Sequence, residues 1–229
     1  MSRRSLFGAL ARGALLAGLA LAGIFAGLVV LYAFAPPVST LMLGRKIEGK
    51  SYERTYVRLN EISPTVVAAV IASEDARFCR NGGVDWDALH EVMNDEDGPK
   101  RGASTITMQT AKNLFLWPGR STLRKGIEIP VALVLGKVWT KARTIEIYLN
   151  IAEWGDGLFG VEAAAQRYFH KKASQLDARE AALLATSLPN PIKRDAGHPT
   201  SFQRRLAAGI VARARGSAEW LDCLPGQGS

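Results

Sequence analysis

Residues 63–78 read SPTVVAAVIASEDARF, an apolar segment that ends on two acidic residues. The Ser-Pro pair at its start is typical of a helix N-terminus, where serine caps and proline takes the first helical position. Val66–Ala72 is entirely apolar, so we expect this helix in the core, with Glu74 and Asp75 at its C-terminal end. Partial desolvation there would raise the pKa of Glu74 and suit it to general acid/base work. The alternative is a solvated helix end.

Capping and terminating residues predict further helices, and alternating strand patterns are scarce, so we expect a mainly α fold. Residues 126–139 are apolar almost all round and contain Pro130, which should break or kink a helix. They form either a buried core element or a segment that dips into a membrane. The other expected helices cover residues 104–116, 141–150, 160–169, 177–188 and 200–215.

One uncharged apolar run is long enough to cross a bilayer. Three arginines precede it, so the positive-inside rule places the N-terminus in the cytoplasm and the rest outside. An Ala-Phe-Ala sequence at residues 33–35 would suit a signal peptidase, but the run is longer than a usual signal sequence, which favours an uncleaved anchor. We therefore divide the chain into a cytoplasmic N-terminus (1–12), a transmembrane anchor (13–35), a stalk (36–50) and one folded domain (51–229).

The chain of 229 residues carries a formal net charge of +8, which favours an anionic partner such as nucleic acid, an acidic membrane surface or a phosphorylated substrate. The exported orientation argues against nucleic acid. It also places Cys79 and Cys223 in an oxidising compartment if the cell has a periplasm. A disulfide and two unpaired thiols both stay open, because the sequence does not give the distance between them.

Four cations lie within fourteen residues, followed by Glu128. Guanidinium groups bind phosphate oxygens in pairs and lysine adds a point charge, so this cluster suits a diphosphate. Glu128 would then hold a divalent metal or orient the cations. The plain alternative is a solvated basic face with a surface ion pair between Arg124 and Glu128. Upstream, Ser104, Thr105 and Thr107 either cap a helix or offer hydroxyls to an anion. The four cations are Lys112, Arg120, Arg124 and Lys125.

Five short motifs follow one another along the chain. Their residues are Glu74, Asp75, Phe78, Gly83 and Asp85; Gly102–Gln109; Arg124, Lys125 and Glu128; Lys141, Ile145, Tyr148, Leu149 and Asn150; and Gly160–Phe169. In this order they resemble the monofunctional biosynthetic peptidoglycan transglycosylases of glycosyltransferase family 51. The chain departs from that pattern at Asn81, where the family usually has histidine. It departs again at Met108, where glutamine is usual, which puts one substrate contact in doubt.

The resemblance implies a lysozyme-like, mainly α domain with a small membrane-associated lobe near residues 115–140. The implied reaction polymerises lipid II into β-1,4 glycan strands, with inversion at MurNAc C1 and release of undecaprenyl diphosphate. Glu74 corresponds to the general base and Glu128 to a second catalytic carboxylate that handles the leaving group and Mg²⁺ or another divalent cation. Asn150 and Glu162 would be structural, or would support the site without touching the substrate. The implied substrate-binding residues are Ser104, Gln109, Lys112, Arg120, Arg124 and Lys125.

By the same resemblance, the protein is a single-pass protein of the cell inner membrane that serves cell wall biogenesis from the periplasmic side. Its substrates would be lipid II and the growing glycan-undecaprenyl diphosphate, with penicillin-binding and division proteins as candidate partners. A glycan hydrolase is a second reading, because one fold supports several functions. A catalytically impaired scaffold that binds lipid II is a third. The cation cluster argues against the hydrolase, and the two retained glutamates argue against the scaffold.

Overall fold

The structure is a computed structural model that describes residues 3–94, 102–119, 121–216 and 221–224. The chain forms two compact units, Met1–Pro36 and Pro37–Ser229. The first unit consists mainly of α1 (Arg3–Tyr32). Its stretch Leu10–Tyr32 is long and apolar enough to cross a membrane, in agreement with the predicted anchor.

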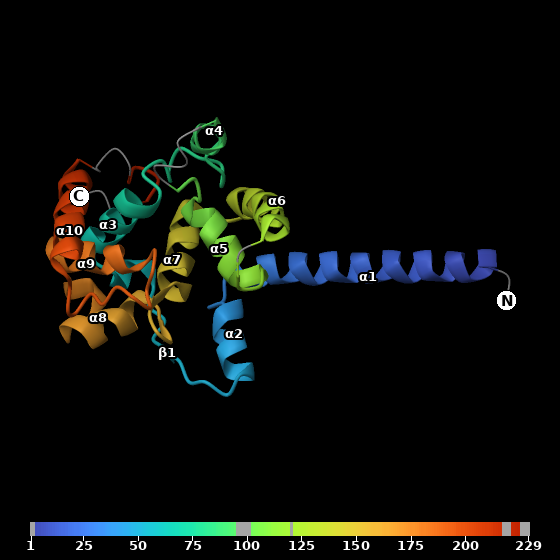
Figure 1. The fold of residues 1–229 in the computed structure, drawn as a ribbon, viewed down its shortest axis with the longest axis horizontal. Helices are drawn as coiled ribbons and strands as arrows, with labels where there is room; N and C mark the ends of the chain where they lie inside the picture. Colours follow the sequence, from blue (N-terminus) through green and yellow to red (C-terminus); the bar gives the residue numbers. More distant parts are fainter. Residues whose placement is uncertain (1–2, 95–101, 120, 217–220, 225–229) are drawn as a thin grey trace. The chain divides into compact units, whose positions relative to one another are not determined.

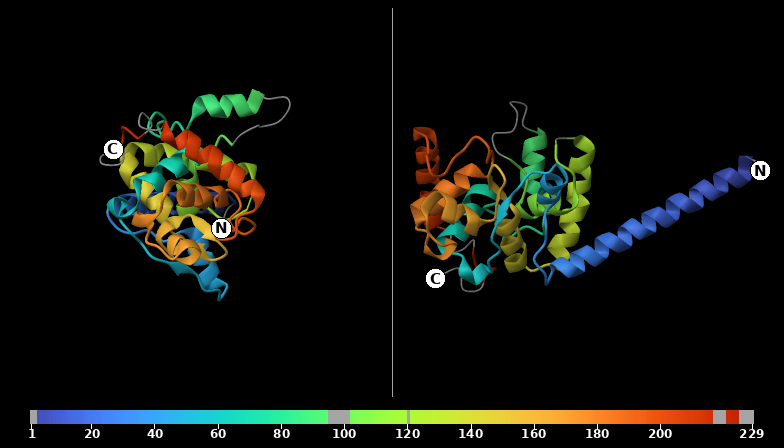
Figure 2. Two further views of the ribbon diagram at one scale, coloured as in Figure 1. Left: turned by 90° about the vertical axis from the view of Figure 1, so that its left-hand side faces the viewer. Right: turned by 90° about the horizontal axis from the view of Figure 1, so that it is seen from below.

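The second unit is mainly α, as the sequence predicts (Figures 1 and 2). Four predicted helices begin where a threonine or aspartate side chain accepts a hydrogen bond from a backbone N–H two or three residues on, namely at Thr105, Thr140, Asp177 and Thr200. The helices are α2 (Thr40–Ile47), α3 (Pro64–Glu74), α4 (Trp86–Asn94), α5 (Ile106–Phe115), α6 (Thr122–Val138), α7 (Lys141–Ile151), α8 (Val161–Phe169), α9 (Ala178–Ser187) and α10 (Ser201–Arg215). Single 3₁₀ turns cover Leu59–Glu61 and Ala173–Gln175.

Three short strands form a small sheet in the order β1-β3-β2. Strand β1 (Glu53–Arg54) runs parallel to β3 (Leu158–Phe159), and β2 (Glu153–Gly155) runs antiparallel to it. Strands this short show no alternating pattern, so the sequence did not indicate them.

Helix α3 is the central core element, as predicted. Its residues Val66–Ile71 are buried, and α9 and α10 pack against it (Figure 1). These neighbours exclude water from most of α3, and its C-terminal end reaches the surface at Ser73 and Glu74.

The predicted stalk is wrong, because residues 37–50 belong to the second unit. Helix α2 packs on α5 and buries Met42. The Thr40 hydroxyl donates hydrogen bonds to the carbonyl oxygens of Asn113, at 3.0 Å, and Leu116, at 2.7 Å. Carbonyls at a helix C-terminus lack partners within the helix, so Thr40 satisfies groups that α5 leaves open.

The expected break at Pro130 does not occur, since α6 runs continuously from Thr122 to Val138. Proline removes only one backbone donor, and the burial of Ala132 and Leu135 on the inner face offsets that loss. The outer face of α6 exposes Leu123 and Val138, at 70% and 52% of their surface. Helix α6 is therefore not a fully buried core element, because it also exposes apolar side chains to the surroundings.

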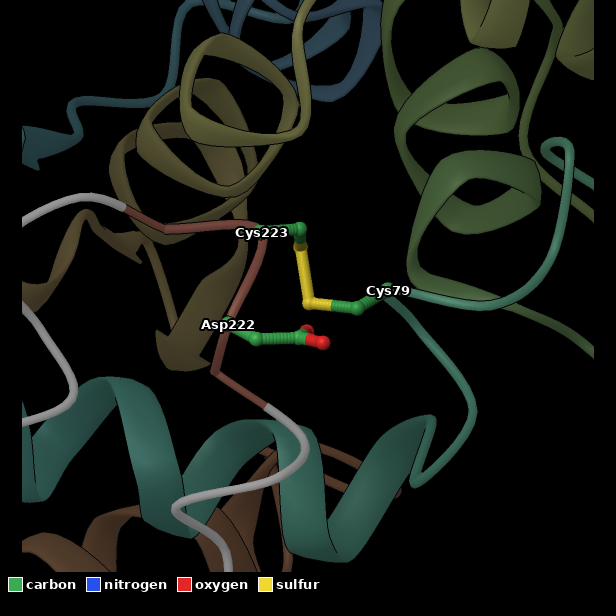
Figure 3. Close-up of side chains that lie close together, drawn as sticks. All are labelled: Cys79, Asp222 and Cys223. Carbon is green, nitrogen blue, oxygen red and sulfur yellow. A yellow bond between two sulfur atoms is a disulfide. The ribbon is translucent and has the colours of Figure 1, made fainter.

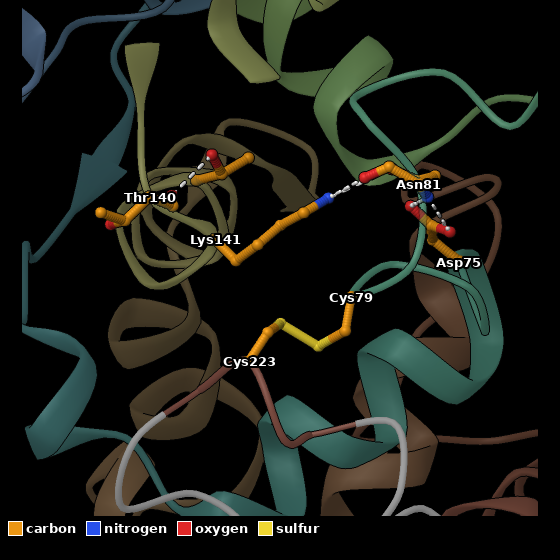
Figure 4. Close-up of a disulfide and its surroundings, with 7 residues drawn as sticks. Asp75, Cys79, Asn81, Thr140, Lys141 and Cys223 are labelled. Carbon is orange, nitrogen blue, oxygen red and sulfur yellow. Dashed lines mark hydrogen bonds between the residues drawn. A yellow bond between two sulfur atoms is a disulfide. The ribbon is translucent and has the colours of Figure 1, made fainter. Parts of the chain in front are cut away.

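A disulfide joins Cys79 to Cys223, with the two Cα atoms 5.5 Å apart (Figures 3 and 4). It links the loop after α3 to a segment in which Leu221 and Leu224 are buried. Asp222 lies close to both sulfur atoms (Figure 3), but these are bonded to each other and cannot hold a metal ion.

Candidate active site

A pocket of about 530 Å³ opens at the C-terminal end of α3, and Glu74, Ser104 and Gln109 are among the residues that line it. The side chain of Gln109 donates from Nε2 to Glu74 Oε2 at 3.0 Å. The Tyr148 hydroxyl donates to Gln109 Oε1, also at 3.0 Å. Because Tyr148 occupies the amide oxygen, Gln109 presents its N–H to the carboxylate and fixes one oxygen of Glu74.

Burial raises the pKa of Glu74, and the hydrogen bonds from Gln109 and Ser73 and the charges of Lys112 and Arg194 only partly oppose the rise. The predicted desolvation of this carboxyl group is thus confirmed. A carboxylate with a raised pKa accepts a proton more readily near neutral pH, which is the property a general base needs.

The loop that follows Glu74 is held by a polar network (Figure 4). Asp75, 7% exposed, accepts hydrogen bonds from the backbone N–H of Ile106 at 3.0 Å and from Asn81 Nδ2 at 3.0 Å. Burial raises the pKa of Asp75 to about 6. The ammonium group of Lys141 donates to the backbone oxygen of Asn81 at 2.7 Å. The network therefore joins the ends of α3, α5 and α7.

Gly83 brings the same loop against α6. Its φ is +106°, and an added Cβ would lie 2.5 Å from the carbonyl oxygen of Ala132. The Thr105 hydroxyl donates to the Gly83 carbonyl oxygen at 2.7 Å. Only glycine combines this backbone conformation with so close an approach.

A second set of charged residues lies around Glu128, which is 2% exposed. One of its oxygens accepts from Arg124, and the other accepts from Lys125 Nζ at 3.1 Å. The alternative of a surface ion pair is therefore wrong. Burial lowers the pKa of Lys112, and the negative charge of Glu128 opposes this.

Lys112 and Arg124 line a pocket of about 330 Å³ with Thr40 and Trp117. The Nε of Arg124 is buried without a hydrogen-bond partner among the described residues. The structure thus brings Lys112, Arg124 and Lys125 together around Glu128, whereas Arg120 lies outside the residues it describes.

A family model described as transglycosylase matches residues 42–213. The chain belongs to the transglycosylase family. It is 53% identical over 201 residues to a protein of Agrobacterium fabrum (strain C58) named biosynthetic peptidoglycan transglycosylase, a match that covers 86% of this chain and 89% of the relative. Proteins of the same name from Nitrobacter hamburgensis and Brucella suis biovar 1 are 53% and 49% identical, over 86% and 87% of this chain and 88% and 90% of the relatives.

The two departures from the motifs of transglycosylases differ in their consequences. Asn81 makes hydrogen bonds, as expected, to Asp75, Gly83 and Lys141. Met108 is fully buried in the core. Its side chain does not line the pocket of Glu74, so the structure gives no support to a lost substrate contact there.

The charged residues of this transglycosylase do not fit a divalent cation bound directly to Glu128. Both oxygens of that carboxylate already accept hydrogen bonds from cationic side chains. A metal ion bound there would lie beside the positive charges of Arg124 and Lys125, which repel it. The other expected role of Glu128, orientation of these cations, therefore agrees better with the geometry.

Two residues were not assigned a role from the sequence, one that holds a pocket residue and one that lines the pocket. Tyr148 lies in a motif, but its contact with Gln109 depends on how α7 packs on α5. Arg213 lines the pocket from α10, and no local pattern could have indicated this. Asn150 and Glu162 are structural, as predicted: Asn150 bonds both backbone groups of Val57, and Glu162 accepts from the Ala173 N–H at 2.7 Å.

Proposed function

We propose that this transglycosylase polymerises lipid II into β-1,4 glycan strands with inversion at MurNAc C1. The observation that carries the proposal lies on α5. Gln109, which holds Glu74, is followed three residues later by Lys112, which belongs to the cation cluster. Residues spaced by three share a helix face, so one helix places a desolvated carboxylate beside a set of cations.

In the proposed reaction, the GlcNAc 4-hydroxyl of the acceptor gives its proton to Glu74 as its oxygen attacks MurNAc C1 of the donor. The new C1–O bond forms on the face opposite the phosphate oxygen, and the old C1–O bond breaks, which inverts the carbon. Negative charge that develops on the departing undecaprenyl diphosphate is stabilised by Lys112, Arg124 and Lys125. Glu128 keeps the latter two in position.

The first test is polymerisation of fluorescent lipid II by the full chain in detergent. We expect lysozyme-sensitive polymer from the wild type and a loss of about 10²–10⁴ in rate for Glu74→Gln, because the base is removed. Glu48→Gln is the matched control, since Glu48 lies exposed on the surface, where it forms a salt bridge with Lys50. If the wild-type protein binds lipid II but forms no polymer, the result would favour the catalytically impaired scaffold instead.

A divalent cation, Mg²⁺ or another, stays a prediction, with the diphosphate rather than Glu128 as its proposed ligand. We expect EDTA to stop polymerisation, and Glu128→Gln to lose about 10²–10³ in rate because the cations lose their anchor. That loss should be equal at low and high Mg²⁺. Recovery of the variant at high Mg²⁺ would instead identify Glu128 as a metal ligand.

We also propose that the protein lies in the cell inner membrane with its catalytic unit in the periplasm. Arginines before the apolar stretch of α1 support this orientation, and so does the disulfide, since disulfides persist in oxidising compartments. The exposed apolar side chains of Trp117, Leu123 and Val138 support the predicted membrane contact of this lobe.

A further inference from the structure

Arg213 lies in the last turn of α10 and lines the pocket of Glu74. Its Nε donates a hydrogen bond to the carbonyl oxygen of Ala72, two residues before Glu74, at 3.3 Å. Arg77, the other cation among the described residues that line this pocket, is bound to Asp85 and Asp87. Arg213 makes no ion pair with any acidic residue in the described part of the chain.

A helix cap alone does not account for Arg213. A cation near the C-terminal carbonyls of α3 is favourable. The contact with Ala72, however, uses one of the five N–H donors of the guanidinium group. The other four remain on an exposed side chain at the edge of the pocket. Such a planar set of donors matches the paired oxygens of a phosphate or a carboxylate.

Arg213 does not line the pocket in which we propose that the leaving group binds. The cations proposed to bind the departing diphosphate, Lys112 and Arg124, line a different pocket. The pocket shared by Glu74 and Arg213 is where the acceptor has to lie, because Glu74 takes the proton of the acceptor hydroxyl.

We infer that Arg213 binds an anionic group of the acceptor and so positions its hydroxyl on Glu74. This inference rests on the proposed function. An acceptor lipid II offers two groups of the required chemistry, the phosphates of its diphosphate and the carboxylates of its peptide. Both present the paired oxygens that a guanidinium group recognises.

The test measures transfer from a donor whose 4-hydroxyl is blocked to an acceptor of varied concentration, with the full chain in detergent. We expect Arg213→Gln to raise the KM for the acceptor roughly ten- to a hundredfold, the range of a lost charge-assisted hydrogen bond. The KM for the donor should stay within about twofold. Arg215→Gln is the matched control: Arg215 is also in the last turn of α10 but lines the groove between α9 and α10.

Two acceptors distinguish the bound group, one without the peptide and one without the diphosphate. The rise in KM should persist for whichever acceptor keeps the group that Arg213 binds. Arg213→Lys, which can still cap α3, should show a smaller rise, and it decides the question if the glutamine variant has a lowered thermal midpoint. If the acceptor KM of Arg213→Gln equals that of the Arg215→Gln control, or if only its donor KM rises, the inference is wrong while the proposed function stands. Absence of polymer from the wild type would defeat the proposed function as well.

Discussion

Glu74 and Asp75 are adjacent in the sequence, but their carboxylates lie in different environments. Glu74 borders the pocket, whereas Asp75 is buried and tied to the N-terminus of α5. The pKa of Asp75, about 6, is above the value of about 3.9 expected in the unfolded chain. The folded protein therefore holds this proton more tightly. The stabilisation is complete below about pH 4 and is lost as the pH rises through 6.

We therefore expect ionisation of Asp75 to lower the free energy of unfolding by about 2–3 kcal/mol between pH 4 and pH 8. Urea unfolding of the wild type and of Asp75→Asn across this range measures the effect, because the variant lacks the titrating group. Other carboxylates contribute equally to both proteins. Identical pH slopes for the two would show that Asp75 ionises as freely in the folded state as in the unfolded state.

For single residues, the sequence predicted the environment of a side chain where neighbours in the sequence determine that environment. Glu74 was expected to be desolvated because an apolar helix precedes it directly, and the structure agrees. The contact of Tyr148 with Gln109 and the place of Arg213 in the pocket could not be predicted, since both depend on the packing of helices far apart in the chain.

The junction between the loop after α3 and helix α6 depends on Gly83. An alanine there would place its Cβ against the carbonyl oxygen of Ala132 in a backbone conformation that strains any side chain. We expect Gly83→Ala to cost about 2–5 kcal/mol of unfolding free energy, from strain and overpacking together. The adjacent Gly82→Ala is the control, because a Cβ at Gly82 meets nothing within 4 Å. Thermal or urea unfolding of both variants checks the prediction, which fails if they are equally stable.

Elements were predictable where capping residues mark their ends. Thr105, Asp177 and Thr200 carry such signals, and the helices that follow them begin as expected. Helix α2 was missed because its proline- and glycine-containing surroundings resemble a linker. Its contacts with distant parts of the chain, such as that of Thr40 with Leu116 and that of Arg45 with Asp156, show that it belongs to the domain. Helix α4 and the three strands were missed as well, since segments so short are stabilised mainly by tertiary contacts.

For the molecule as a whole, the disulfide is the one covalent link in the described residues between segments far apart in the sequence, 144 positions from Cys79 to Cys223. Closing so long a loop restricts the unfolded chain strongly. We expect the paired variant Cys79→Ser/Cys223→Ser to lose about 2–5 kcal/mol of unfolding free energy. Denaturant unfolding without reductant measures this loss. A wild type equally stable with and without dithiothreitol would argue that the link adds nothing.

The order of the two cysteines along the chain has a consequence for biogenesis. Cys223 follows every helix and strand in the described part of the catalytic unit. With the periplasmic orientation proposed above, Cys79 therefore cannot pair until all of them have been synthesised and translocated. A molecule stalled during export would keep Cys79 as a reactive thiol. A finished molecule would resist thiol-alkylating reagents. With the proposed orientation, the state of these two cysteines reports complete translocation, and a gel shift after thiol alkylation measures it without any added tag.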